Sequence, residues 1–307
     1  MNFKLTEEQE MIRQSAHDYA QLELIKDVIE RDTNAIYHAE HVKKLKELGF
    51  FGIITDEKYG GTGLDYLSYV LAISEFSKVD SSIGVILSVH NSLAVAGIER
   101  FGNEKQKQKY LPQLASGDKI GAFLLSEPEA GSDASSQRTT AIDKGDHYLI
   151  NGTKNWITNA NSGSIYLVVA QTHRDKKHHG INAFIVEKDT PGISLGPHED
   201  KMGMRSSDTH SVMFSDVKVP KENRLGEDGF GFKFAMKMLD SGRISIAAQA
   251  LGIAEGAYER ALHYSKERKA FGKEISKHQA IAFKLAEMKT RIEAARNFVW
   301  KAAWEKA

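Results

Sequence analysis

The spacing of apolar residues changes twice along this chain, and those changes limit the folds open to it. Up to about residue 115 the apolar residues recur at helical intervals, whereas from 119 to 220 they form short β-rich runs separated by turns. After Gly229 the helical spacing returns, and about 40 residues follow without a proline. This order predicts an α+β multidomain protein with an N-terminal helical domain (1–118), a middle antiparallel β-barrel or sandwich domain (119–228) and a C-terminal helical bundle (229–307).

Local signals predict where the helices and strands lie. Thr6 and Gln9 have the spacing of a capping box, so a helix should begin there. Further helical patterns cover 39–48, 65–78 and 81–101, and strands are predicted at 120–125, 148–150, 165–170, 183–186 and 211–219. Turn signals occur at 144–146, 151–152 and 191–192.

The two C-terminal helices should be long. The first corresponds to roughly 60 Å of helix, and the second starts near His278. Its apolar residues follow steps of four and three, as in an antiparallel bundle: Ile281, Leu285, Met288, Ile292, Ala295 and Val299. Because two such helices alone leave apolar faces uncovered, we expect that the chain lacks a C-terminal portion or uses another subunit as cover.

The composition excludes several classes of function. The chain has 41 Lys and Arg against 41 Asp and Glu, which removes the electrostatic reason to expect a nucleic acid or an anionic membrane as partner. It has no Cys, so disulfides, thiolate nucleophiles and Cys-based metal sites are excluded. The N-terminus shows no signal segment, and His90 and Asn91 interrupt the apolar stretch 81–98. We therefore expect a cytoplasmic protein without membrane insertion, in which that stretch is a buried helix.

Three histidines lie close together at His173, His178 and His179. Charged residues surround them, and no carboxylate and His pair at helical ligand spacing accompanies them. We interpret this segment as a solvated loop and expect no metal.

Two runs in the β-rich part carry candidate binding residues. Residues 122–134 read as a strand running into a loop of small and hydroxyl residues, which presents amides and Ser donors to a phosphate or a polar heterocycle. In the second run, Trp156 and Thr158 share a face if the chain stays extended. An indole beside a hydroxyl suits a large flat heteroaromatic cofactor, although a Trp taken alone is more often a core residue.

Two more candidate runs lie in the helical C-terminal part. Arg268, Phe271 and Gly272 follow the long helix, where cations are also favoured simply by the helix dipole. Within that helix stands the segment 240–243, whose Gly242 costs about 1 kcal/mol relative to Ala. Such a glycine admits either the close approach of a ligand or a packing contact with a neighbouring helix.

Taken together, these runs closely resemble the acyl-CoA dehydrogenase flavoprotein family. The resemblance rests on Ser-Glu-Pro-x-Ala-Gly-Ser-Asp at 126–133, Asn-Gly-x-Lys-x-Trp-Ile-Thr-Asn at 151–159, and Arg-x-x-Phe-Gly at 268–272 with His278-Gln279. It covers essentially the whole chain in the same order. The helix segments 239–244 and 249–254 look most like the short-chain, butyryl-CoA type.

The resemblance implies FAD as the cofactor and assigns residues to it. The loop residues that would wrap the flavin are Phe123, Leu125, Ser126, Gly131 and Ser132, with Ser126 near the pyrimidine edge. Trp156 would lie against the isoalloxazine, Thr158 would bond near N5, and Ile157 would also contact the cofactor. The residues that would contact the pyrophosphate and adenosine, typically across a dimer interface, are Arg268, Phe271 and Gln279. The residues that would meet acyl-CoA are Ser132, Asp240, Ser241, Gly242 and Arg243.

The implied reaction removes an α-proton from a short-chain acyl thioester and transfers a β-hydride to flavin, as in fatty acid β-oxidation. A 2-enoyl-CoA results, and the electrons would pass to an electron-transfer flavoprotein. The family habit also implies a homotetramer built as a dimer of dimers.

The sequence departs from the family where the catalytic base is expected. Most members carry a Glu in a Tyr-Glu-Gly loop near the C-terminus, and no such loop occurs here. Other branches place the Glu on the long helix, where this chain has Gly242. We therefore expect the base to lie beyond the given chain and this 307-residue form to bind flavin poorly and turn over little or nothing. The alternatives are an acyl-CoA oxidase of the same fold and a non-catalytic flavin- or acyl-CoA-binding remnant.

Overall fold

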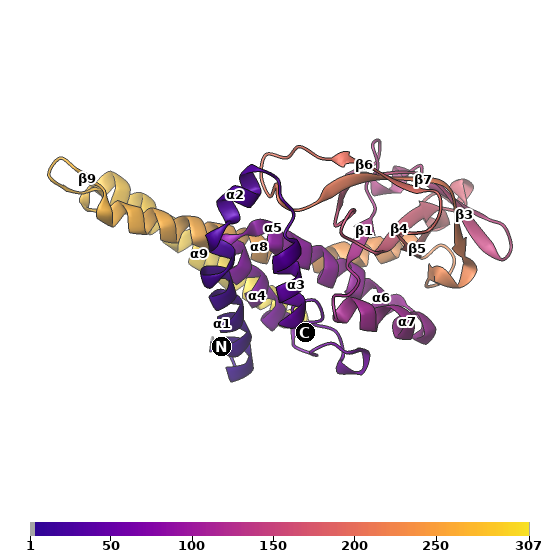
Figure 1. The fold of residues 1–307 in the computed structure, drawn as a ribbon, viewed down its shortest axis with the longest axis horizontal. Helices are drawn as coiled ribbons and strands as arrows, with labels where there is room; N and C mark the ends of the chain where they lie inside the picture. The colour runs from indigo at the N-terminus through magenta and orange to yellow at the C-terminus, as the bar shows by residue number, and fades with distance from the viewer. Residues whose placement is uncertain (1–3, 307) are drawn as a thin grey trace. The chain divides into compact units, whose positions relative to one another are not determined.

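The computed structural model describes residues 4–306. Contacts divide them into two compact units. One unit combines the described residues up to Ile29 with Asp65–Gly84 and the described residues from Ile244 onward. The other consists of Glu30–Leu64 and Val85–Arg243. Helices occupy both ends of the chain and strands its middle (Figure 1), which confirms the predicted α+β class.

The helical elements include one that is π-helical, η3. They are α1 (Glu7–Leu22), α2 (Val28–Thr33), α3 (Ala39–Glu47), α4 (Tyr66–Val79), α5 (Ser81–Ser88), η3 (Val89–Val95), α6 (Ala96–Phe101), α7 (Glu104–Ala115), α8 (Gly231–Glu267) and α9 (Gln279–Lys306). Short 3₁₀ turns cover Leu24–Lys26, Glu57–Tyr59, Ala134–Ser136, Arg174–Gly180, Lys221–Asn223 and Ile275–Lys277.

The strands form one eight-stranded sheet and one small hairpin. They are β1 (Gly121–Leu124), β2 (Thr140–Asp143), β3 (His147–Thr158), β4 (Ile165–Gln171), β5 (Ile181–Glu187), β6 (Ile193–His198), β7 (Thr209–Pro220), β8 (Arg224–Leu225), β9 (Lys269–Ala270) and β10 (Lys273–Glu274). The order in the sheet is β6-β7-β3-β2-β4-β5-β8, with β1 beside β4. Most pairs are antiparallel, but β4 pairs in parallel with β1 and with β2.

The first unit begins as the local sequence predicts. The Thr6 side chain accepts from the Gln9 amide, and the Gln9 side chain accepts from the Thr6 amide, so the predicted capping box is confirmed. Partly buried ion pairs then join the helices: Arg13 of α1 reaches Glu75 of α4 at 3.2 Å, and Arg296 of α9 reaches Glu255 of α8 at 2.5 Å.

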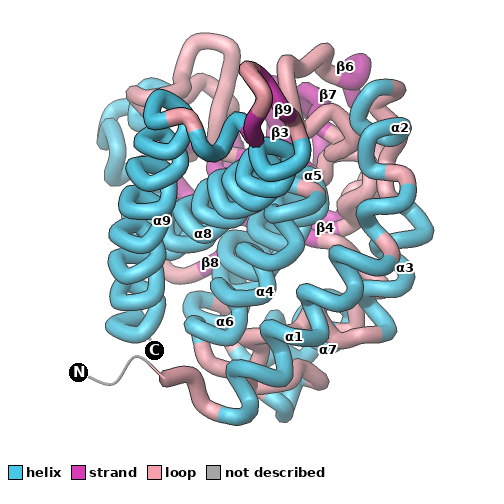
Figure 2. Tube along the Cα trace, turned by 90° about the vertical axis from the view of Figure 1, so that its left-hand side faces the viewer, coloured by secondary structure: helices cyan, strands magenta, loops and turns pink. Residues whose placement is uncertain are grey.

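Glycines let α8 approach α4 closely within the first unit. A Cβ at Gly252 would lie 2.2 Å from the carbonyl oxygen of Ser74, and one at Gly256 would lie 2.1 Å from that of Lys78. Figure 2 shows α8 beside α4 and α9, and α9 also packs against α4. On α9, Ile292 and Val299 of the predicted apolar seam are buried, whereas Ala295 is exposed.

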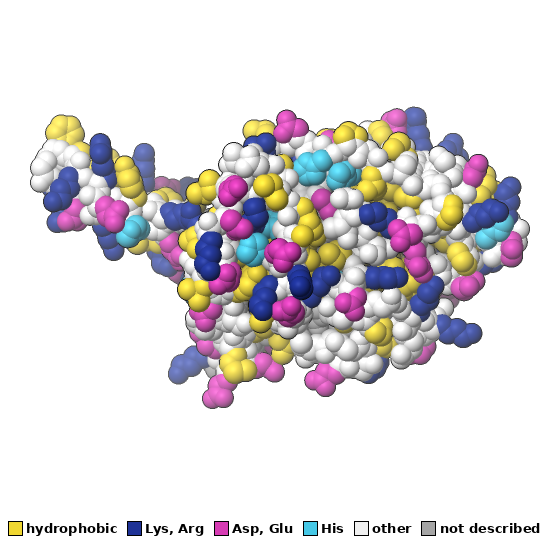
Figure 3. All heavy atoms as spheres, viewed as in Figure 1, with side chains coloured by type: hydrophobic (Ala, Val, Ile, Leu, Met, Phe, Trp, Pro, Cys, Tyr) yellow, Lys and Arg dark blue, Asp and Glu magenta, His cyan; other side chains and the backbone are white. Residues whose placement is uncertain are grey.

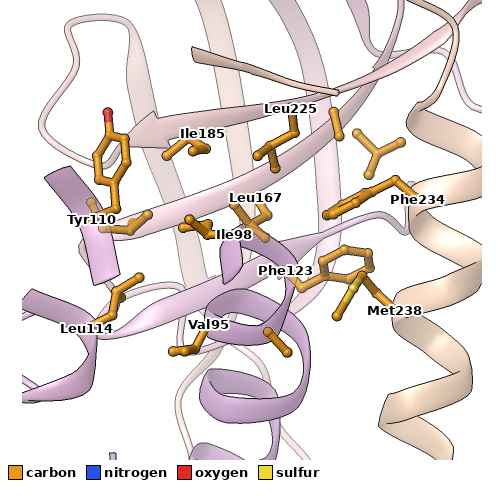
Figure 4. Packing of buried hydrophobic residues seen from close by; sticks show 14 of the residues in the cluster. Val95, Ile98, Tyr110, Leu114, Phe123, Leu167, Ile185, Leu225, Phe234 and Met238 are labelled. Atoms are coloured by element: carbon orange, nitrogen blue, oxygen red, sulfur yellow. The ribbon is translucent and has the colours of Figure 1, made fainter. Parts of the chain in front are cut away.

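In the second unit, strands β1, β4 and β5 are buried on both faces, and alternate residues of the sheet serve two cores. Along β4, Leu167 packs in one core and Val168 in the other, as the two-residue period of a strand requires. The first core lies between the sheet and helical residues such as Val95 and Phe234 (Figure 4). The second core is formed by side chains of the sheet's own strands that face one another. Tyr148 of β3 meets Phe184 of β5 edge-on with ring centroids 4.8 Å apart, although the two strands are not neighbours.

One predicted turn is wrong. The Asn-Gly pair 151–152 was expected to end a strand, but β3 runs through it with a register shift against β7 between Ile150 and Gly152. Gly152 has a φ of 146°, and a Cβ there would lie 2.6 Å from the Thr139 hydroxyl oxygen. The pair therefore makes a bulge, because the flanking residues continue to pair with one partner strand.

The apolar helical stretch Ser81–Phe101 is long and apolar enough to cross a membrane by length and composition alone. In the structure, however, 78% of its most apolar window is buried inside the protein. The predicted buried helix is therefore confirmed.

Candidate functional site

The predicted binding loop leaves β1 and bends back on itself. The amide of Glu127 donates to the carbonyl of Ala130 at 2.9 Å, and the amide of Asn155 in β3 donates to the carbonyl of Ser126 at 2.9 Å. Leu125 and Ser126 are half-buried, whereas Gly131 and Ser132 are exposed. The loop therefore keeps small and hydroxyl residues accessible.

Gly131 lies beside open space. A Cβ added there would meet nothing within 4 Å, and the backbone of Gly131 is outside the left-handed region that favours glycine. Within residues 4–306, neither packing nor backbone conformation explains the glycine. The open space is instead suited to a ligand that approaches the backbone closely.

Phe123 differs from the other predicted flavin-binding residues of the loop because its side chain is buried. Its side chain is 9% exposed and packs in the first core beside Phe234 and Met238 (Figure 4). Any contact of Phe123 with a ligand would therefore have to use its backbone.

A buried ion pair, which the sequence reasoning missed, fastens this loop to β3. The Nζ of Lys154 lies 2.7 Å from Oε1 of Glu127, and the two residues are 0% and 4% exposed. Both belong to the quoted motifs, as the Glu of Ser-Glu-Pro and the Lys of Asn-Gly-x-Lys. The signal was thus present in the sequence, but nothing local indicated that the two would meet.

The electrostatics of this pair follow from its burial. Burial lowers the pKa of Lys154 to about 8, against the opposing attraction of the Glu127 carboxylate. Burial alone would raise the pKa of Glu127, but the Lys154 ammonium and the hydrogen bonds from Thr139 and Arg138 outweigh it. The net pKa of Glu127 therefore lies below its ordinary value.

Trp156 stands at a second bulge of β3. The register against β7 shifts between Lys154 and Ile157, and Trp156 has a φ of 61°, which is strained for a bulky residue. Its indole is 63% exposed, so the interpretation of Trp156 as a core residue is wrong.

The bulge also overturns the argument that put Trp156 and Thr158 on one face, because the chain does not stay extended between them. Ile157 lies in the second core at 2% exposure, while Thr158 is half-buried and pairs with Thr209 of β7. The side chain of Ile157 is therefore unavailable to a ligand, whereas Trp156 and Thr158 remain accessible.

A pocket of about 430 Å³ follows the binding loop in the same unit. Its walls are hydroxyl, amide and basic side chains: Ser135, Ser136, Gln137, Arg138, Gln171, Arg174, Lys177 and His178. Arg174 donates to the carbonyl of Arg138 at 3.2 Å, which holds two of the cations together. The three basic side chains Arg138, Arg174 and Lys177 around one pocket suit a phosphorylated ligand.

The predicted segment on α8 is partly engaged within the protein. Asp240 and Arg243 form an exposed ion pair at 2.5 Å, and Ser241 is buried and accepts from Arg100 at 3.3 Å. A Cβ at Gly242 would lie 3.0 Å from Cδ2 of Leu93, so this glycine makes a close packing contact with η3.

The remaining predicted residues belong to the first unit. Phe271 and Gly272 form the turn of the β9–β10 hairpin, both with positive φ (51° and 77°), and Phe271 is 97% exposed. Arg268 before the hairpin and Gln279 at the start of α9 are also exposed. Figure 3 shows cationic and apolar side chains together at the end of the α8–α9 pair that carries β9. This exposed, cationic tip is suited to a phosphate and a flat ring.

Among residues 4–306, no group of three His, Asp or Glu side chains is placed to hold a metal ion. The rings of His178 and His179 lie tilted against each other with centroids 4.0 Å apart, and the His178 ring also contacts Phe232.

Family models match nearly the whole chain. Those of the acyl-CoA dehydrogenase N-terminal, middle and C-terminal domains match residues 6–118, 122–217 and 229–307. A short-chain specific acyl-CoA dehydrogenase from Clostridium acetobutylicum is 49% identical over 306 residues, which cover 100% of this chain and 81% of the relative.

Solved structures share the fold throughout. Butyryl-CoA dehydrogenase from Megasphaera elsdenii superimposes with a TM-score of 0.98 at 50% identity, covering 100% of this chain and 81% of that one. A chain in a structure described as the electron transferring flavoprotein of Acidaminococcus fermentans gives a TM-score of 0.98 at 52% identity, covering 100% and 80%. An acyl-CoA dehydrogenase from Bacillus anthracis complexed with FAD gives 0.91 at 36% identity, covering 98% and 51%.

Proposed function

This chain belongs to the acyl-CoA dehydrogenase family of FAD-dependent oxidoreductases acting on CH–CH bonds, and on that premise we propose that it serves the α,β-dehydrogenation of a short-chain acyl-CoA to a 2-enoyl-CoA. The short-chain class is supported by the relatives at about half identity, which are short-chain and butyryl-CoA dehydrogenases. The observation that carries the proposal is the accessible loop 126–132 fastened to the strand that presents Trp156.

The residues of the second unit fit FAD. An exposed indole on a strained backbone can cover a flat ring, and a strained residue at a candidate site is a reason to suspect function. The open space beside Gly131 leaves room for the cofactor at the backbone. The hydroxyls of Ser126 and Thr158 are donors for the polar edge of a heterocycle. When bound, FAD supplies the acceptor for the hydride that leaves the β-carbon.

The cationic pocket supports a coenzyme A thioester as the substrate. CoA carries several phosphates, and Arg138, Arg174 and Lys177 provide matching positive charge just beyond Ser132. We assign the phosphorylated end of the substrate to this pocket. On α8, the exposed Asp240–Arg243 pair provides polar groups for the substrate. Gly242 between them contributes no side chain that would contact the substrate.

We propose that the base which takes the α-proton is a glutamate outside these 307 residues. The sequence contains no Tyr-Glu-Gly segment, and Gly242 has no side chain to act as a base. Glu127 is a poor candidate because it is 4% exposed and engaged by Lys154 and two backbone amides. We therefore expect little or no turnover from the chain as given, a form that would also bind flavin poorly.

Several broader assignments are proposals as well. We propose domains at 1–118, 119–228 and 229–307, supported by the family-model matches that fall inside those limits. An electron-transfer flavoprotein as electron acceptor is supported by the Acidaminococcus structure. A homotetramer and a place in fatty acid β-oxidation follow from the family resemblance, whereas the cytoplasmic location is proposed from the sequence pattern alone.

The test is the visible absorption spectrum of the purified chain, recorded beside its intact mass. A flavin band that anaerobic butyryl-CoA leaves unchanged, or saturable uptake of added FAD without turnover, supports the proposal. Robust formation of 2-enoyl-CoA would overturn the claim that the base lies elsewhere. Failure of the chain to take up FAD under any condition would overturn the flavin assignment, and a high peroxide yield in air would favour an oxidase.

A further inference from the structure

The charged groups of Lys154 and Glu127 are fully engaged in hydrogen bonds. The ammonium of Lys154 donates to Oε1 of Glu127 at 2.7 Å, to the carbonyl of Leu125 at 3.0 Å and to Oε1 of Gln137 at 3.2 Å. These three acceptors use all three of its donors. The Glu127 carboxylate also accepts from the amides of Arg138 at 2.5 Å and Thr139 at 3.1 Å.

Stability alone does not explain why such a pair is buried. Removing two charges from water costs several kcal/mol for each ion, and well-packed apolar residues of similar volume are often as stable or more so. A buried pair of this kind is better explained by the geometry that it specifies.

The geometry specified here joins two segments far apart in sequence. Lys154 forms the last regular pair of β3 with Val212 before the bulge that turns Trp156 outward. Its ammonium bonds to Leu125, just before the Ser126–Ser132 loop, and to Gln137, five residues after that loop. The backbone bond from Asn155 to Ser126 closes the same junction at 2.9 Å. One buried cation therefore links the loop and the Trp156 bulge.

We propose that Lys154 and Glu127 are positioning residues for the flavin site, which hold the Ser126–Ser132 loop and the Trp156 indole in the mutual arrangement that binds the cofactor. This inference rests on the proposed function for the identity of the cofactor. Neither residue needs to touch the flavin, because each acts through the loop or the strand.

The test uses the full chain with Trp156 as the only tryptophan, in a Trp300→Phe, Trp304→Phe background. Lys154→Met keeps most of the length of the side chain and removes the charge. Glu127→Gln keeps one of the two acceptor oxygens and removes the charge. The matched control is Lys218→Met, which removes an exposed lysine from neighbouring strand β7. Emission and acrylamide quenching of Trp156 are measured without cofactor, and FAD affinity is measured by titration.

We expect each single variant to change the quenching of Trp156 and to raise the Kd for FAD about tenfold, the ratio for one lost charge-assisted hydrogen bond. Lys218→Met should change neither. The double variant Glu127→Gln, Lys154→Met should recover thermal stability, because no charge remains buried alone, but not FAD affinity. If FAD affinity recovers together with stability, or if Trp156 quenching never changes, the positioning role is overturned.

The two proposals fail in different ways. A parent chain that takes up no FAD would overturn the flavin assignment. The coupling of the pair to Trp156 would then still be decided by the quenching measurements, which need no cofactor. If the parent binds FAD and the Lys154→Met variant binds it with the same affinity, only the positioning role is overturned.

Discussion

The backbone amide of Gly121 donates to Nδ1 of His90 across 3.0 Å, and this bond joins the first residue of β1 to the π-helical segment η3. Because Nδ1 is an acceptor, the proton of the neutral ring is on Nε2, which donates to the carbonyls of Phe51 at 3.0 Å and Leu114 at 3.1 Å. The ring is completely buried, and this burial lowers its pKa to about 4. The start of the strand that leads into the binding loop thus depends on a neutral histidine.

Acid should therefore destabilise the protein through His90. The unfolded ring has its ordinary pKa of 6.5, so the unfolded state binds the extra proton first as the pH falls. The stability contributed by His90 is complete above pH 6.5 and is lost progressively towards pH 4, to a total of about 3 kcal/mol. Denaturant unfolding at several pH values measures this loss. As the pH falls, the free energy of unfolding should decrease less steeply for His90→Gln than for the parent, whereas the exposed His179→Gln should behave as the parent does. If the free energy of unfolding fell with pH at the same slope in His90→Gln and in the parent, this prediction would be contradicted.

Gly256→Ala should destabilise the first unit. The new Cβ would lie 2.1 Å from the carbonyl oxygen of Lys78, so α4 and α8 must move apart. Overpacking of this kind costs about 1–3 kcal/mol of the free energy of unfolding. Chemical denaturation measures the loss, and Gly203→Ala, where a Cβ meets nothing within 4 Å, is the control. An equal effect of both substitutions would exclude the close approach of the helices as the cause.

At position 156 the backbone conformation should make a glycine variant more stable than an alanine variant, the reverse of the usual order of stability. With a φ of 61°, the position favours a residue without a Cβ. Trp156→Gly should therefore be more stable than Trp156→Ala by about 1 kcal/mol without cofactor. Both should bind FAD more weakly than the parent, because the exposed indole is gone. The two readouts are thermal unfolding of the cofactor-free chain and FAD titration, and an alanine variant as stable as the glycine variant would refute the strain argument.

Gly131→Ala should separate folding from binding. The added methyl group has no atom of the described residues within 4 Å, so the free energy of unfolding should change by less than about 0.5 kcal/mol. If the cofactor occupies the open space beside this residue, the same methyl group should raise the Kd for FAD about tenfold. Unchanged FAD affinity would place the cofactor elsewhere.

Arg174→Gln should weaken binding of the substrate's phosphorylated end. The side chain lines the cationic pocket and is exposed, so we expect a rise of about fivefold or less in the Kd for butyryl-CoA, larger at low salt. Isothermal titration at two ionic strengths measures this, with the exposed Arg291→Gln on α9 as control. Butyryl-pantetheine, which lacks the nucleotide, should bind both variants and the parent equally. A difference there would argue against phosphate recognition.

The sequence by itself determined the features that arise within a few residues. The Thr6–Gln9 capping box, the Gly145 turn and the long proline-free helix α8 depend on contacts between near neighbours, and all are found in the structure. The order of helices and strands follows from the same local periodicity. The motif residues were recognised for the same reason, as short runs of consecutive residues.

Only the tertiary structure decided how distant segments meet. The Asn151-Gly152 pair reads locally as a turn, but continued pairing with β7 makes it a bulge. Trp156 reads locally as core, and a second bulge turns it outward, while the partner of Lys154 lies 27 residues away. Such outcomes depend on strand register and on the cost of burying an unpaired charge. Both are set by partner segments brought together in folding, so residues close in sequence do not reveal them.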